Sequence, residues 1–276
     1  MARFSPSDAA LEGFRVLREH WRVVVGWSIF NVVALLALSV LGAVVSFGAA
    51  AASSAGAVTF SGAFGALLAS LGEAFTTAII AGGLFRLMLR PEEPGYLHLR
   101  IGMDEVRILG VWLALTIAAF LLLGVCAALV VAGRGIGPLA AIGAWFVVAG
   151  VGAWLGLRVS LSAVASFAER RFAFHRSWRL TRGHSASLLG MAVLSLTLIL
   201  LIGLLVGMVI FVAMSFGVGL GAMMEATFSD NGLADHPWVY VAELGAQLAL
   251  FPAFLVLMLS PWVAAYQAFA GETAPA

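Results

Sequence analysis

The residues of this sequence whose types could do chemistry are polar side chains placed inside long apolar segments. Glu73 and Glu243 lie within two such segments, and Gln247 follows Glu243 by one helical turn. Asn31 lies in a third segment, and Arg158 lies towards the end of a fourth. An ionisable group is costly inside a bilayer, so each of these residues is a candidate for function. The two glutamates could form part of a path for a proton or a solute, in a small transporter or channel that also uses Arg158.

The same residues also have a structural interpretation. Arg158 can pair with a carboxylate of another helix, or it can extend its guanidinium group to the edge of the membrane. Two carboxylates and one arginine are few groups for a transporter, so we favour this interpretation. We therefore predict that Arg158 is neutralised by a carboxylate or lies at the headgroup boundary.

The composition indicates that these residues belong to a membrane protein. Of 276 residues, 62% are hydrophobic and 11% are charged, whereas a soluble domain has about 25% charged residues. A membrane-spanning helix needs about 20 apolar residues. Six segments meet that length, near 23–47, 64–89, 108–132, 138–167, 188–216 and 239–269. Because the segments lack the alternation of barrel strands, we predict an all-α polytopic helix bundle that forms one integral membrane domain over 1–276.

The positions of the arginines predict how the chain is oriented. The chain has no lysine, and its arginines gather before the first segment and in the second and fourth connections, whereas the first, third and fifth connections together contain only Arg134. Positive residues are retained on the cytoplasmic side. We therefore expect both termini in the cytoplasm, and the composition, rich in alanine, glycine and arginine, suggests a bacterial inner membrane.

The arginine-rich stretches also have the pattern of short amphipathic helices at the membrane surface. Residues 1–22 place Leu11, Phe14, Leu17 and Trp21 on one helical face, and residues 169–184 should form a similar helix. In that second stretch the side chains that could contact anionic lipid headgroups are Arg171, His175, Arg176, Trp178, Arg179 and Arg182. Residues 14–20 match 178–184 in register, whereas a copy near 99–110 is poorer. An interfacial helix followed by two spans would then occur three times, unless the match is chance.

The segment from Arg158 onwards resembles a known bacterial family. Its features are Arg158, the acidic Glu169, the motif Ser-Trp-Arg-Leu-Thr-Arg-Gly over 177–183, and the late Pro-Trp-Val-Ala-Ala-Tyr over 261–266. These resemble the six-span membrane domain of glycerophosphoryl diester phosphodiesterase and related inner-membrane proteins. The resemblance covers the second half well and the first half by architecture only. It implies no phosphodiesterase activity here, because the catalytic barrel of the named members needs about 250 residues of its own.

No other pattern predicts an enzyme or a cofactor site. The sequence has no phosphate-binding glycine loop after a strand, no nucleophile with a base, and no Cys-His cluster. Glu225, Asp230, Asp235 and His236 match no metal-binding spacing, and a net charge of +1 does not favour nucleic acid as a partner. Close glycine pairs, Gly152/Gly156 and Gly203/Gly207, suit helix contacts within one chain or in a homo-oligomer. We expect a non-enzymatic protein with no cofactor whose partners are the bilayer and anionic phospholipid, unless the arginines serve only to set the topology.

Overall fold

The computed structural model describes residues 4–51, 55–93, 95, 97–134, 137–228 and 235–272. Among these residues the regular structure is helical and contains no strand. The helices are α1 (Pro6–Glu19), α2 (Trp21–Ala51), α3 (Ala55–Leu89), α4 (Met103–Arg134), α5 (Pro138–Val159), α6 (Ser162–Ala168), α7 (Phe174–Leu180), α8 (Ser185–Val218), α9 (Leu220–Phe228) and α11 (Pro237–Glu272).

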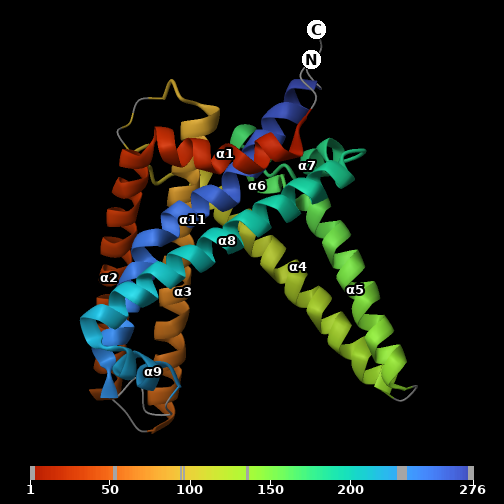
Figure 1. Ribbon diagram of the computed structural model, residues 1–276. Coiled ribbons are helices and arrows are strands. Elements are labelled where there is room, and N and C mark those ends of the chain that lie inside the picture. Colours follow the sequence, from red (N-terminus) through yellow and green to blue (C-terminus); the bar gives the residue numbers. More distant parts are fainter. Residues whose placement is uncertain are drawn as a thin grey trace. The chain divides into compact units, whose positions relative to one another are not determined.

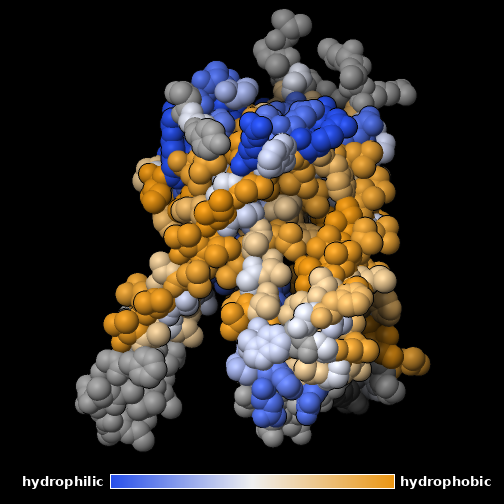
Figure 2. Space-filling view, turned by 60° about the vertical axis from the view of Figure 1, so that its left-hand side comes forward, coloured by the Kyte–Doolittle hydropathy of each residue, from blue (hydrophilic) through white to orange (hydrophobic). Residues whose placement is uncertain are grey.

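Six segments of the described chain are helical, long enough and apolar enough to cross a membrane. They lie in α2, α3, α4, α5 with α6, α8 and α11. In the most apolar 18-residue stretch of the α8 segment, no residue is buried by the protein. Figure 2 shows hydrophobic residues (orange) along the sides of the helices and hydrophilic residues (blue) gathered near their ends. An apolar surface of this extent requires lipid around it. The prediction of an all-α polytopic bundle is confirmed, and the chain is a multi-pass membrane protein.

The chain packs as two compact units. The first unit comprises Met1–Ala10, Ala81–Ala192 and Pro261–Ala276, and the second comprises Leu11–Ile80 and Val193–Ser260. In the first unit α4 packs along α5 and against α6, while α7 packs against α5 and α6. Figure 1 shows α6 and α7 near the end of α5 that is opposite to its beginning at Pro138. This arrangement places the arginine-rich connections of the first unit around the helix ends.

The fourth apolar segment, expected as one span over 138–167, is one candidate span that is interrupted into two helices. Helix α5 ends at Val159, and α6 begins at Ser162. The hydroxyl of Ser160 donates to the carbonyl of Leu157 at 2.9 Å, and that of Ser162 donates to Val159 at 2.6 Å. Serine hydroxyls that bond back to the preceding turn compete with the helical backbone bonds. Six of the seven residues of α6 are buried, so it is an internal helix of the first unit.

In the second unit, close contacts between helices depend on glycine. A Cβ atom at Gly13 of α1 would lie 2.8 Å from the Cα atom of Leu257 in α11. A Cβ atom at Gly72 of α3 would lie 2.6 Å from a methyl group of Leu38 in α2. Any larger residue would push these helices apart, as expected for membrane helices that approach at small residues.

The predicted interfacial helices are present in part. Helix α1 forms within residues 1–22, and it buries Ala9, Ala10 and Val16, while the predicted apolar residues Leu11 and Trp21 stay exposed. The middle connection was expected to form a similar helix, but its described residues before α4 are not helical. Prolines at 91 and 94 disfavour a helix there. The middle copy of the predicted threefold repeat therefore shows no interfacial helix among the residues described before α4, and the repeat itself stays a prediction.

The described ends of the chain lie together within the first unit. The rings of Phe4 and Phe269 are 4.8 Å apart between centroids. The stacked ring of His184 lies 4.5 Å from Phe269 on the same end of α11.

Candidate functional site

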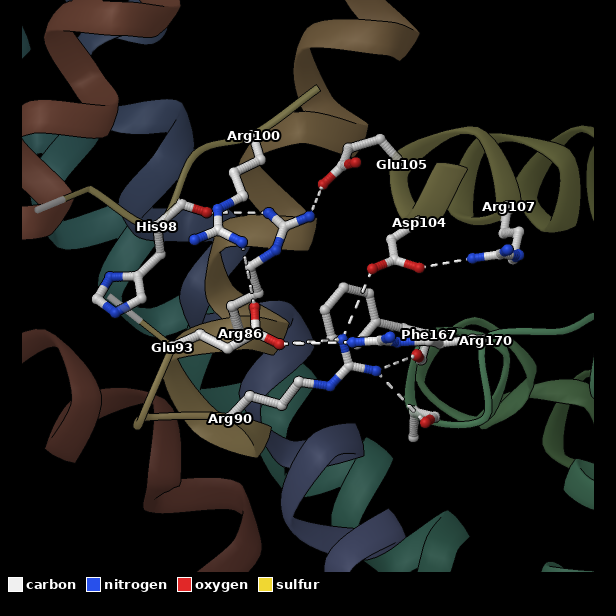
Figure 3. A network of polar contacts seen from close by, with 11 residues as sticks. Arg86, Arg90, Glu93, His98, Arg100, Asp104, Glu105, Arg107, Phe167 and Arg170 are labelled. Atoms are coloured by element: carbon white, nitrogen blue, oxygen red, sulfur yellow. Dashed lines mark hydrogen bonds and ion pairs between the residues drawn. The ribbon is translucent and has the colours of Figure 1, made fainter. Parts of the chain in front are cut away.

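A buried ion pair joins the end of α3 to the start of α4. Arg86 donates from Nη2 to Oε1 of Glu105 and from Nη1 to the carbonyl of His98 at 2.9 Å. Arg86 is 3% exposed and Glu105 is fully buried. A Cβ atom at Gly82 would lie 2.7 Å from Oε1 of Glu105, so glycine is needed for the carboxylate to reach this position. The pair fixes the connection between the second and third spans (Figure 3).

A second layer of contacts joins this connection to α6. Arg90 donates from Nη2 to the carbonyl of Phe167 at 3.0 Å, and its guanidinium group lies 4.8 Å from the centre of the Phe167 ring. Asp104 accepts from Arg107 at 2.6 Å and lies 3.6 Å from Arg90. The carbonyls at the end of α6, which lack partners within the helix, are thus paired by a cation.

Glu93 faces three guanidinium groups from different parts of the first unit. Its carboxylate oxygens lie 3.6 Å from Arg90, 3.6 Å from Arg100 and 3.7 Å from Arg170, beyond ordinary hydrogen-bond distance. With Arg86, Asp104, Glu105 and Arg107, these residues line a cavity of about 370 Å³. We call this set the arginine network. Its five arginines face three carboxylates, so it carries a formal excess of two positive charges.

A smaller basic pocket lies at the connection between α6 and α7. It has a volume of about 200 Å³ and is lined by Glu169, Arg171, Phe172, Ala173, His175, Arg176 and Arg179. Arg171 donates to Oε2 of Glu169 from both Nε and Nη2, at 2.9 and 2.8 Å, and Nε of Arg176 lies 3.3 Å from Oε1. One carboxylate and three arginines therefore line this pocket. We refer to these residues as the basic pocket.

The stretch 169–184 differs from the helix expected there. The helix covers only Phe174–Leu180, because Arg170 and Gly183 adopt positive φ angles of 54° and 91° on either side of it. Ser177 and Leu180 face the protein interior, whereas the basic candidates Arg171, His175, Arg179 and Arg182 are all exposed. The basic stripe is thus present on the surface, but a short helix with two flanking turns carries it.

Arg158 lies in the last turn of α5 without a carboxylate partner among the described residues. Its guanidinium carbon is 5.5 Å from the ring centre of Trp154 and 5.7 Å from that of Trp178. The carbonyl of Arg158 accepts from Ser177 at 2.9 Å and from Thr181 at 3.4 Å. Cation–π contacts therefore take the place of the expected carboxylate. Of the residues that carry the family resemblance, Arg158 thus contacts Ser177, Trp178 and Thr181.

The other intramembrane candidates belong to the second unit. The side-chain amide of Asn31, buried in α2, donates to the carbonyl of Leu248 in α11 at 2.7 Å, which is a helix-packing contact. Glu73 is exposed on α3. Glu243 accepts from Gln247 at 3.3 Å, and both residues line a groove of about 810 Å³ that Glu73 does not line. The carboxylates of Glu73 and Glu243 therefore do not meet in one cavity of the second unit.

Among the described acidic and histidine residues between α8 and α11, Glu225 of α9 and His236 form an ion pair. Nε2 of His236 lies 3.5 Å from Glu225, and Asp230 lies outside the described residues. No group of three metal-binding side chains occurs in the part of the chain that the structure describes.

Comparisons with protein-family models, with curated proteins and with solved structures find no match to this sequence. The case for function therefore depends on the geometry of the two basic sites and of the groove.

The arginine network was not singled out by the sequence. Arg86, Arg90, Arg100 and Arg107 could be interpreted as orientation signals alone, and Glu105 as part of a solvated connection. The available signal was the pairing of acidic residues in the first turn of an apolar helix with arginines at the end of the preceding one. Gly82 inside α3 was a second signal, because a helical glycine often marks a close approach.

Proposed function

We propose that this protein is a non-enzymatic membrane protein of the bacterial inner membrane that binds anionic lipid headgroups at its basic pocket. The observation that carries the proposal is the imbalance of charge around Glu169. This single carboxylate pairs with Arg171 and Arg176, Arg179 lines the same pocket, and the exposed Arg182 follows on the same stretch. Among the described residues neither Arg179 nor Arg182 has a carboxylate within 4.0 Å.

Exposed aromatic residues beside the pocket support a position at the membrane surface. Phe172 is 59% exposed and Trp178 is 37% exposed. The Phe172 ring packs over Gly110 of α4, at a distance where a Cβ atom would be 3.1 Å away. Aromatic side chains concentrate at the level of lipid headgroups. A phosphate at that level would contact the guanidinium groups while the lipid chains contact the rings.

The expected strength of binding follows from the number of arginines. Each arginine near an anionic surface contributes about 1 kcal/mol. Arg179 and Arg182 together would contribute about 2 kcal/mol, or roughly a 30-fold change in affinity. The arginine distribution also favours placing this surface and both termini on the cytoplasmic side, where anionic lipids attract basic segments. The resemblance to the phosphodiesterase membrane domain agrees with a membrane role and adds no catalytic residue.

A transporter or channel is the weaker proposal. It would need Glu73, Arg158 and Glu243 to line one water-filled path. Within the second unit Glu73 does not line the groove that contains Glu243, and Arg158 is engaged by two indole rings. These surroundings favour headgroup binding as the function to test first.

The test compares an Arg179→Gln/Arg182→Gln variant with the wild-type protein. Both proteins are extracted in mild detergent, and the co-purified phosphatidylglycerol, cardiolipin and phosphatidylethanolamine are quantified by mass spectrometry. We expect the variant to lose most of the anionic lipid and to keep its zwitterionic lipid. An Arg179→Lys/Arg182→Lys variant is the matched control, because it retains the charge and should retain the lipid. Equal anionic lipid in a correctly oriented Gln variant would contradict the proposal.

A further inference from the structure

A hollow of the second unit lies between α8 and α11. It has a volume of about 810 Å³, and its walls come from α8, α9 and α11. Pockets that bind small organic molecules measure about 300–1,000 Å³. On α8 the wall contains Gly203 and Gly207, and a Cβ atom at Gly207 would meet nothing within 4 Å. The absence of a side chain at these positions contributes to the space.

The lining of this α8–α11 groove combines flexible and aromatic apolar side chains. Three methionines, Met214, Met223 and Met224, line it from α8 and α9. Phenylalanines line it from both long helices, including Phe251 and Phe254. Methionine adapts to ligands of irregular shape, and aromatic faces attract organic cations. The wall is therefore suited to a bulky apolar molecule that carries positive charge.

A single carboxylate lies in this apolar wall. Glu243 is six residues beyond the start of α11, or about 9 Å along the helix axis. Its contact among the described residues is the amide of Gln247 at 3.3 Å, and no basic side chain of the described chain lies within 4.0 Å of it. A carboxylate in an apolar membrane segment is stabilised by an opposite charge. The protein does not supply that charge here, so a ligand can.

We propose that the α8–α11 groove binds a lipophilic organic cation, such as a quaternary ammonium or phosphonium with aromatic substituents. Glu243 pairs with the cationic centre, Phe251 and Phe254 offer their faces, and the methionines enclose the apolar substituents. An anionic lipid is disfavoured by the carboxylate. A neutral acyl chain leaves Glu243 without a counter-charge. Charge complementarity thus selects the cation among the three occupants.

The test measures binding of radiolabelled tetraphenylphosphonium to the full-length protein in nanodiscs of uncharged lipid. Wild-type protein should bind the cation saturably, and the neutral triphenylphosphine oxide should not compete. Glu243→Gln should lower the affinity at least tenfold. Glu73→Gln is the matched control, because it removes an exposed carboxylate of the same unit that does not line the groove. It should bind as the wild type does.

A second pair of variants tests the location by filling the groove. Gly207→Leu should block binding, because its side chain enters the open space of the groove. Gly245→Leu introduces the same side chain on α11 at a position that is also open but does not line the groove, so it should leave binding unchanged. Gel filtration and circular dichroism establish that each variant is folded.

A third measurement uses the wild-type protein alone. Dicyclohexylcarbodiimide modifies carboxyl groups in apolar surroundings, and tetraphenylphosphonium should protect Glu243 from it while leaving Glu73 reactive. The absence of saturable binding, equal binding by Glu243→Gln, or modification of Glu243 at saturating cation would each overturn the proposal. Equally strong competition by triphenylphosphine oxide would also overturn the proposal. Such a result would show that the groove binds apolar molecules regardless of their charge.

Discussion

Two glutamates on membrane-spanning helices have opposite surroundings. Glu105 is fully buried in the first unit, where Arg86 donates to it and Gly82 leaves room for it. Glu243 is exposed on the wall of an apolar groove in the second unit, where only an amide contacts it among the described residues. The first carboxylate has its counter-charge within the fold, whereas the second does not. The contrast separates a structural charge from one that is available to a ligand.

The largest expected effect comes from removing the paired carboxylate. Glu105→Ala would leave Arg86 buried with the carbonyl of His98 but without its counter-charge. Breaking one side of a buried pair costs about 3–5 kcal/mol. Thermal unfolding of the purified protein in detergent should show this loss, and Glu73→Ala should change stability by less than about 0.5 kcal/mol. A double Arg86→Met/Glu105→Leu variant should recover much of the stability, because neither charge remains to be desolvated.

A smaller loss is expected from crowding the same pair. Gly82→Ala would place a methyl group 2.7 Å from Oε1 of Glu105, which cannot move without leaving Arg86. Overpacking of this kind costs about 1–3 kcal/mol. The control is Gly190→Ala on α8, where a Cβ atom meets nothing within 4 Å and helix propensity favours alanine by about 0.5–1 kcal/mol. A lower melting temperature for Gly82→Ala and a higher one for Gly190→Ala would support crowding of the ion pair. Equal changes in the two variants would contradict it.

The indole rings around Arg158 should contribute less to the free energy of unfolding than the buried ion pair does. Trp154→Leu removes one of the two rings over the guanidinium group, and Trp154 is 47% exposed. A partly solvated cation–π contact contributes about 1 kcal/mol. Trp145→Leu is the matched control, since Trp145 lies on the same helix, is 54% exposed and has no cation over its ring among the described contacts. Unfolding in denaturant should separate the two variants, and identical midpoints would argue against a role for the rings.

The smallest effect on stability is expected at the unpaired carboxylate. Glu243→Gln removes a charge that no described basic side chain compensates, so stability should change by less than about 0.5 kcal/mol. The same thermal unfolding assay used for Glu105→Ala measures it. A loss comparable to that of Glu105→Ala would show that Glu243 has an unrecognised partner in the fold, and the contrast between the two glutamates would fail.

Much of the fold follows from local composition, and much of the site does not. The six apolar segments identify six spans, because length and hydropathy alone decide what can cross a bilayer. The end of α5 at Val159 was missed, because the apolar segment continues while serine hydroxyls bond back to the preceding turn. Hydropathy averages over such local hydrogen bonds and cannot detect them.

The partners of individual charges were harder to predict than their positions. Arg158 was expected to pair with a carboxylate or to lie at the headgroup boundary, and the described contacts of its guanidinium group are with the rings of Trp154 and Trp178. Its position at the headgroup boundary stays a prediction. The pairing of Arg86 with Glu105 joins residues 19 positions apart and depends on how α3 and α4 meet. Such pairs are set by tertiary packing, which a single sequence does not specify. The exposed basic stripe of 171–182 could be predicted from the sequence, because spacing along a short segment decides which side chains share a face.

The claim that the basic pocket binds anionic headgroups is tested most directly by cross-linking lipids in the membrane. Phosphatidylglycerol and phosphatidylcholine carrying the same photoreactive headgroup label are incorporated in separate nanodiscs with the wild-type protein. Mapped by mass spectrometry, the phosphatidylglycerol cross-links should concentrate on residues 169–184 and fall strongly in Arg179→Gln/Arg182→Gln. The phosphatidylcholine cross-links should be fewer there and should not respond to the substitutions. Equal labelling of this segment by both lipids, unchanged in the variant, would contradict the proposed function.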